Sequence, residues 1–402
     1  LNANVLRRTI VYVYAQPAEI IMLGSSAYQI GTSGDINYVR PDGTTGSCNT
    51  AGQGLIANRA QEVAGPSNPG GFTPCSITVG AGQGGVWQIQ FVSPTPTSTA
   101  NPTPIAATAA WTQPNNVGYV TAWDVTVRNA TGTRFPGRAY ANYLALNMGG
   151  NSRALSSQVY IQTSDGYRYN VDLNNMDPFG FIFFSSPLGL VDTATGTPLY
   201  HSVDLEGPNP GSLPAGVTMD VSGAATHKIF FRLPDYANLP ASAPIAGGTT
   251  WLDVPTITPP PPTNFTFDGL EGTGGQGGTY PLGGYFSFDT TLDGSFSIWL
   301  DLNLDGIYGN GNDRRLFGYA SAGTNQIYWD GIDGLGVAVP AGSQSYTAQI
   351  LLNAGEIHFP FIDVENNPNG FIITREVPNF NPPNPSLLFW DDRLVTQEVG
   401  NV

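Results

Sequence analysis

The chain has 402 residues, enough for two or three domains, and its 41% of hydrophobic residues excludes a disordered protein. The formal net charge is −15 and the few basic residues are scattered, which argues against nucleic acid or an anionic membrane surface as a partner. The 50 glycines and 33 prolines disfavour helices and suit short strands joined by turns.

Two apolar segments open the chain, at 9–14 and 19–23, and both predict strands. Because the first lies near the N-terminal end, we expect it to pair with a neighbouring subunit as a donated strand, so that the chain forms a homopolymer. The alternative is that it is the first strand of its own domain. This predicted self-assembly strand consists of Thr9, Ile10, Val11, Tyr12, Val13 and Tyr14. Further along, 55–63 predicts a short helix and 86–92 a strand.

The two cysteines, Cys48 and Cys75, lie in a stretch rich in Gly, Pro and Asn. A covalent link would order such a loop, so we predict a disulfide between them, with two free thiols as the alternative. A disulfide would place the chain in an oxidising, extracellular compartment.

Two proline-rich stretches, 93–104 and 254–264, predict extended spacers. They divide the chain into three predicted modules, 1–92, 105–253 and 264–402. In the middle module short alternating strands are separated by turn signals, as in a β-sandwich. No stretch reaches the roughly 20 apolar residues of a membrane helix.

A run near position 300 carries oxygen-bearing side chains at its first, third and fifth positions, followed by a glycine. This pattern is typical of a loop that wraps a hard cation, and we predict bound Ca²⁺. The strand before it alternates, and if that strand continued, the same side chains would form a solvated face. A surface turn built from Asp and Asn is the other alternative. The predicted metal ligands are Asp301, Asn303, Asp305, the backbone carbonyl of Ile307, and Asp313.

Trp299 shares a strand face with Asp301 and is the best candidate for stacking on a host or matrix carbohydrate, although most tryptophans are core residues. The three histidines have no metal-ligand spacing, and no nucleophile elbow occurs. We therefore expect that the protein is not an enzyme. A glycosidase needs only two carboxylates, so a secreted polysaccharide hydrolase stays as a third possibility.

A second motif follows the candidate cation loop and consists of Trp329, Asp330, Gly331, Asp333, Gly336, Val339, Pro340, Gly342 and Tyr346. It resembles a hairpin of immunoglobulin-like modules in flagellar hook-capping, gliding-motility and secretion-associated surface proteins of bacteria. The cation run resembles the Asp-rich hairpin loops of such proteins, and segments around positions 140, 180, 360 and 390 are similar to adhesin-type surface proteins. The resemblance implies a structural role, in which Asp and Gly set turns while Trp and Tyr pack.

Together these features predict an all-β fold of two or three immunoglobulin-like or jelly-roll-like β-sandwich modules in tandem. The expected function is that of an extracellular structural subunit of a bacterial surface filament, pilus or layer, assembled by strand pairing between subunits. The alternative is a non-polymerising adhesin or carbohydrate-binding protein.

Overall fold

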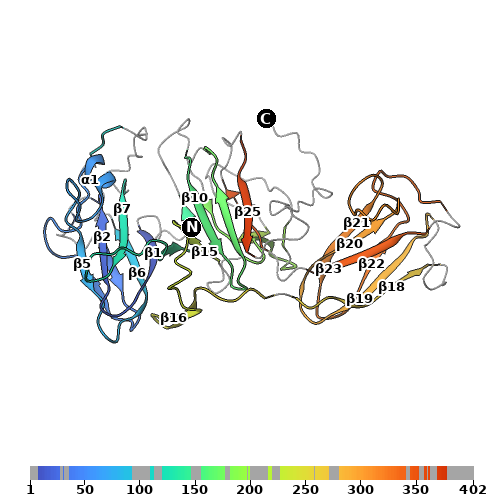
Figure 1. Ribbon diagram of the computed structural model, residues 1–402, viewed down its shortest axis with the longest axis horizontal. Coiled ribbons are helices and arrows are strands. Elements are labelled where there is room, and N and C mark those ends of the chain that lie inside the picture. The colour runs from blue at the N-terminus through green and yellow to red at the C-terminus, as the bar shows by residue number, and fades with distance from the viewer. Residues whose placement is uncertain are drawn as a thin grey trace. The chain divides into compact units, whose positions relative to one another are not determined.

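The computed structural model describes residues 8–27, 30, 36–92, 109–112, 120–145, 155–176, 182–196, 198–199, 216–219, 227–257, 259–270, 280–340, 345–352, 357–359, 361–362 and 369–377. These residues form 25 strands and a single six-residue helix (Figure 1). The all-β, multi-module fold class is confirmed. The helix, α1 (Arg59–Ala64), overlaps the predicted range 55–63 and begins after Asn58, whose side chain accepts a hydrogen bond from the Gln61 amide.

The chain divides into two compact units, unit 1 (Leu1–Thr256 with Ile357–Val402) and unit 2 (Ile257–Glu356). The boundary between them falls inside the predicted spacer 254–264, whereas the spacer 93–104 lies outside the described residues. The other predicted boundaries need correction. Strands from 1–92 and 105–253 share one sheet, and 264–402 is split, because its last strand pairs within unit 1. Unit 2 is therefore an insertion in unit 1, and the modules do not simply follow one another.

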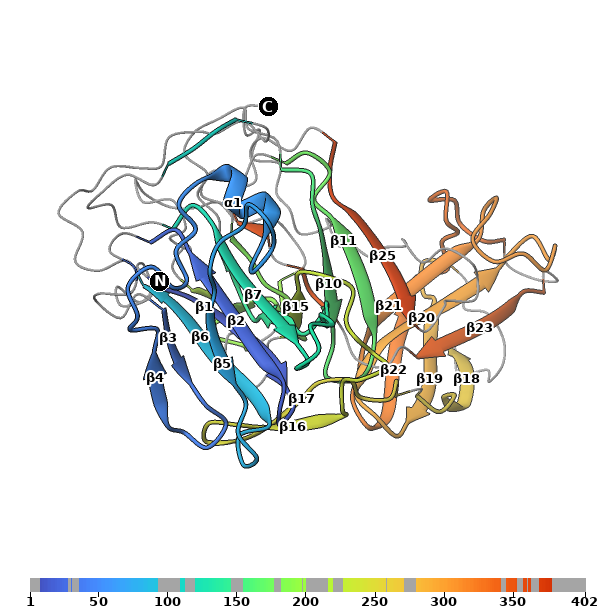
Figure 2. The same cartoon turned by 60° about the vertical axis from the view of Figure 1, so that its left-hand side comes forward.

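Unit 1 is built on a sheet of eleven strands (Figure 2). Adjacent strands of this sheet come from distant parts of the sequence. The sheet therefore joins the predicted modules 1–92 and 105–253, which the spacer 93–104 was expected to separate. Along the main path the order is β17 (Gly248–Trp251), β16 (Ser242–Ile245), β6 (Gly85–Val92), β1 (Arg8–Ala15), β8 (Ala139–Ala141), β15 (Lys228–Phe230), β10 (Gln158–Gln162), β11 (Arg168–Asp172) and β25 (Ile372–Val377); β3 (Ile36–Val39) pairs with β6, and β4 (Thr45–Ser47) with β3.

Smaller sheets cover parts of this large one. The sheet β5-β2-β7 packs over β1 and β6, where Val11, Ile21 and Trp87 are fully buried in a shared apolar core. A second core joins β10, β11 and β15 to β12. The strands of the smaller sheets are β2 (Ile20–Ser25), β5 (Cys75–Thr78) and β7 (Trp123–Arg128), then β9 (Leu144–Ala145), β12 (Ile182–Phe183) and β24 (Phe361–Ile362), and the pair β13 (Leu190–Asp192) and β14 (Val217–Met219).

Strand β1 holds the residues 9–14 that were predicted to pair with another subunit. It pairs with β6 along its whole length, and its other edge pairs with β8 at Tyr12 and Val13. Val11 and Val13 are fully buried. The prediction of a donated strand is therefore corrected in favour of its alternative: β1 is an internal strand of its own unit, because its apolar face is needed for that unit's core.

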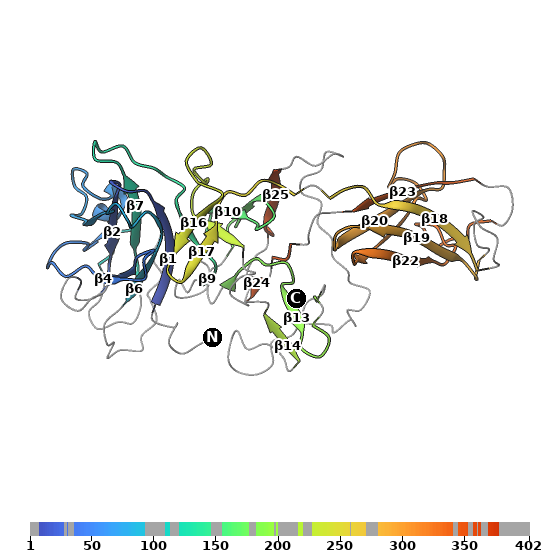
Figure 3. The same ribbon diagram turned by 90° about the horizontal axis from the view of Figure 1, so that it is seen from below.

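Unit 2 is a sandwich of two three-stranded antiparallel sheets, which Figure 3 shows as two layers. Phe286 and Phe288 of one sheet pack against Phe296 and Ile298 of the other, and all four are buried. One sheet has the order β18 (Thr263–Gly269), β19 (Gly284–Thr290), β22 (Gly323–Trp329), and the other has the order β21 (Arg314–Ala320), β20 (Gly294–Asp301), β23 (Thr347–Leu352).

Candidate metal centre

The predicted cation loop occupies 302–313, between β20 and β21 of unit 2. Strand β20 ends at Asp301, so the predicted side chains do not continue as a solvated strand face. The chain turns because Leu304 and Gly306 adopt positive φ angles of 59° and 78°. Leu304 leaves the alternation of the strand and is 51% exposed.

Side-chain oxygens organise the loop. Asn303 Oδ1 accepts the Asp305 amide at 2.9 Å, and Asp305 Oδ1 accepts the Ile307 amide at 2.8 Å. Asn310 joins them, because its Nδ2 donates to Asp305 Oδ2 at 2.9 Å while its Oδ1 accepts from Asn303 Nδ2 at 3.0 Å. The hydrogen bonds from Asn310 and from the Ile307 amide lower the pKa of Asp305, which keeps this carboxylate ionised.

The two carboxylates at the ends of the loop have different environments. Asp301 is 2% exposed, and its Oδ2 accepts the Gly306 amide at 2.9 Å. Its Oδ1 is buried without a hydrogen-bond partner. Asp313 instead uses both oxygens, since Oδ1 accepts the Leu302 amide at 3.0 Å and Oδ2 accepts the amides of Gly309 and Asn310. Asp313 therefore closes the base of the loop.

The structure thus brings Asp301, Asn303 and Asp305 onto one loop, with the Ile307 backbone beside them. Within the described ranges, no three His, Cys, Asp or Glu side chains are grouped so as to hold a metal ion. The loop offers a mixed set instead, with carboxylate, amide and backbone oxygens, which Ca²⁺ accepts. Sequence reasoning did not include Asn310, although its place in a run of Gly and Asn residues was a signal for a loop-closing role.

A neighbouring turn of unit 2, around Gly334, contacts the loop. The Gly334 amide donates to the Asn312 carbonyl at 2.9 Å, and a Cβ added at Gly334 would lie 2.0 Å from the Asp313 carbonyl oxygen. Only glycine allows such a close approach. The loop is therefore fixed from outside as well as by its own hydrogen bonds.

That turn belongs to the hairpin motif that begins at Trp329. Asp333 Oδ1 accepts the amides of Leu335 and Val337, which sets the turn. Trp329 is 1% exposed and packs against Tyr346, with ring centroids 5.3 Å apart. Its indole N–H donates to the Ile332 carbonyl. In this segment the acids set turns and the aromatic residues pack, as the motif predicts.

Trp299 lies beside the candidate loop and is half-buried. The Arg315 guanidinium sits over its ring, 4.6 Å from the centroid, and donates to Ser297 Oγ at 2.7 Å. Gly309 of the loop also approaches the ring, because a Cβ there would lie 3.0 Å from it. The indole therefore supports the loop and the Arg315 side chain, which reduces the ring area offered to a sugar.

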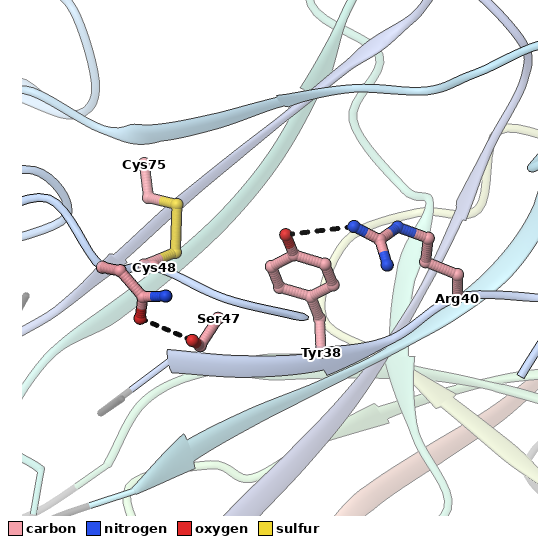
Figure 4. The surroundings of a disulfide bond; sticks show 6 residues. Tyr38, Arg40, Ser47, Cys48 and Cys75 are labelled. Atoms are coloured by element: carbon pink, nitrogen blue, oxygen red, sulfur yellow. Dashed lines mark hydrogen bonds between the residues drawn. A yellow bond between two sulfur atoms is a disulfide. The ribbon is translucent and has the colours of Figure 1, made fainter. Parts of the chain in front are cut away.

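In unit 1, Cys48 and Cys75 form a disulfide, as predicted, with their Cα atoms 5.9 Å apart (Figure 4). Both residues are buried in the core beneath β2 and β6. Nearby, Arg40 donates to the Tyr38 hydroxyl at 3.4 Å. The disulfide joins the loop after β4 to the first residue of β5.

Comparison with protein-family models, curated proteins and solved structures finds no match for this chain. Among the residues that the structure describes, no helix has the length and apolar character needed to cross a membrane.

Proposed function

We propose that this chain is an extracellular structural protein of a bacterial surface filament or layer. The observation that carries the proposal is the buried disulfide between Cys48 and Cys75 in an all-β chain, since disulfides persist in oxidising compartments. The low content of charged residues, 11%, and the many antiparallel strand pairs also suit a durable protein outside the cell.

The mode of assembly that we propose differs from the one predicted from the sequence. Because β1 is internal to its sheet, it is not the strand that pairs with a neighbour. The two small sheets of unit 2 end in β18 and β22, and in β21 and β23. Such edge strands present unpaired backbone groups and are sites at which another chain can add. Assembly through these edges leaves the core of each subunit intact.

Electron microscopy and analytical ultracentrifugation of the full chain, purified without reductant, test this function. We expect filaments or lattices that grow with protein concentration and survive while the disulfide is intact. Monodisperse single particles at every concentration and salt condition would reject a structural polymer. Deletion of β1, in contrast, is expected to unfold unit 1, and therefore does not test the mode of assembly.

A second candidate function, glycan binding, is favoured by one feature of β21. Phe317 and Tyr319 lie two residues apart on its outer face and are 37% and 51% exposed. They pair with Ser297 and Ser295 of β20, on the strand that carries Trp299. Aromatic rings exposed on a sheet face suit stacking on sugar rings. Glycan-array binding that is lost in Tyr319→Ala, but kept in a control Tyr285→Ala on the other sheet, would support an adhesin. Equal binding by both variants would reject this surface.

A further inference from the structure

The buried carboxylate of Asp301 is incompletely satisfied. Its Oδ2 is held by the Gly306 amide, which directs the group into the loop, while Oδ1 is buried and has no hydrogen-bond partner. Buried charged oxygens without partners are strongly unfavourable, so native structures pair them with a donor, a water molecule or a cation. This oxygen is therefore available to bind a water molecule or a cation.

No basic side chain in the described part of the chain supplies that partner. Among the described residues, no Lys, Arg or His nitrogen forms an ion pair with Asp301 within 4.0 Å. The adjacent basic residues are engaged elsewhere, since Arg314 approaches Asp330 at 3.8 Å and Arg315 lies over Trp299. The groups that follow on the loop are the oxygen-bearing side chains of Asn303 and Asp305.

We propose that the loop 302–313, with Asp301, is a calcium site in which Asp301 Oδ1 is the buried ligand. Asn303, Asp305 and the backbone carbonyl of Ile307 complete the protein's share of the ligands, and water fills the remaining positions. Ca²⁺ takes six to eight oxygens in flexible geometry, whereas Mg²⁺ demands a regular octahedron. The absence of His and Cys from the described loop disfavours zinc.

Asp313 has a different role from the one predicted from the sequence. Its two oxygens accept three backbone amides, those of Leu302, Gly309 and Asn310, so it closes the base of the loop and is not counted as a ligand. Asp305 also accepts three hydrogen bonds, but two of them come from the side-chain amides of Asn303 and Asn310. Because Asp305 is exposed, a cation can displace these two side-chain donors without breaking the backbone of the loop. Two carboxylates then bind the ion. A low number of charged ligands favours weak sites, with dissociation constants of about 10⁻⁴ to 10⁻³ M, as in extracellular modules.

Calcium titration of the full chain after chelator treatment tests the site, with isothermal calorimetry and thermal melting as readouts. We expect saturable binding of one Ca²⁺ and a melting temperature of unit 2 that rises with calcium up to about 10 mM. Mg²⁺ at the same concentrations should give a smaller shift. The site does not depend on whether the chain polymerises, so the result is independent of the microscopy described above.

The decisive variant is Asp301→Asn, with Asp293→Asn in an exposed turn of the same unit as a control. Asp301→Asn should weaken calcium binding at least about tenfold, and it should melt no earlier than the wild type without calcium, because a buried charge is removed. If Asp301→Asn does not fold, the exposed Asp305→Asn variant carries the same expectation for affinity. No calcium-dependent shift in the wild type, or an equal shift in wild type and variant, would overturn the proposal.

Discussion

A buried ion pair in unit 1 offers the sharpest test of how that unit is stabilised. Arg138 donates to both carboxylate oxygens of Glu19, at 3.0 and 2.7 Å, and to Asp235 at 3.0 Å. The side chains are 2%, 10% and 15% exposed. The guanidinium also lies 4.6 Å from the centroid of the Phe135 ring. The network links Glu19, the residue before β2, to Arg138 and Asp235, which are both far away from it in the sequence.

We expect Arg138→Met to destabilise unit 1 by about 3–5 kcal/mol. Methionine keeps most of the apolar contact, but it leaves the Glu19 carboxylate buried without a counter-charge, with the Gln16 amide at 2.7 Å still donating to it. This loss is a large part of the roughly 5–15 kcal/mol by which domains are usually stable. Urea unfolding, followed separately for the two units, measures it.

Two variants make the result interpretable. Arg59→Met removes a pair with Glu62 whose side chains are 34% and 30% exposed, and should change stability by no more than about 1 kcal/mol. The double variant Glu19→Gln with Arg138→Met removes the stranded charge and should recover part of the loss. The reasoning is refuted if Arg138→Met costs no more than Arg59→Met, or if the double variant is less stable than Arg138→Met alone.

Three further changes probe other parts of the molecule. Replacing Cys48 and Cys75 with alanine removes a link across 27 residues and should lower the stability of unit 1 by roughly 3.5 kcal/mol in urea unfolding, an effect that reductant should reproduce in the wild type. Burial lowers the pKa of Lys228 from 10.5 to about 7, so between about pH 7 and 10.5 the unfolded chain binds a proton that the folded chain lacks. Stability should therefore rise with pH in that window, by up to about 1.4 kcal/mol per unit, and Lys228→Met should flatten the slope. Gly334→Ala places a Cβ against a backbone oxygen of the candidate loop and should lower both the melting temperature of unit 2 and the calcium affinity, whereas Gly82→Ala, with open space around it, should change neither.

Local patterns in the sequence predict those features that depend on neighbouring residues. The alternation along 9–14 and 296–300 gives strands β1 and β20, and the Asp, Asn and Gly residues after Leu300 end β20 where the loop begins. The disulfide was predictable because the chain has only two cysteines. Each of these features lies within a short stretch or depends on a single pair of residues.

Strand partners could not be predicted in this way. Val13 pairs with Ala139, and Val171 pairs with Ile373, yet no local signal links either pair. Every half-buried strand shows the same period of two, so the pattern determines which face is buried but not which strand lies alongside. The proline-rich stretch 93–104 therefore suggested a module boundary, although β6 before it and β8 after it belong to one sheet.

The candidate site shows the same limit at the level of single atoms. The sequence predicts that Asp301, Asn303 and Asp305 converge. It does not predict that both side-chain oxygens of Asp313 accept hydrogen bonds from backbone amides. Nor does it predict that Asp301 keeps one buried oxygen without a partner, because this depends on where the Gly306 amide points. The choice between a ligand and a structural acid is made by hydrogen-bond geometry, which the spacing of residues does not contain.

The two units are stabilised by different features, a disulfide in one and a proposed calcium site in the other. Each feature requires a particular environment, so together they indicate the compartment in which the protein functions. Unit 1 holds the disulfide, which forms where thiols are oxidised, and unit 2 holds the proposed calcium loop, which fills only where calcium approaches millimolar concentration. The two features lie in different units, so we expect their effects on stability to add. An extracellular setting supplies both conditions at once. If calcium stabilises unit 2 while reductant destabilises only unit 1, two separate observations will support the same location.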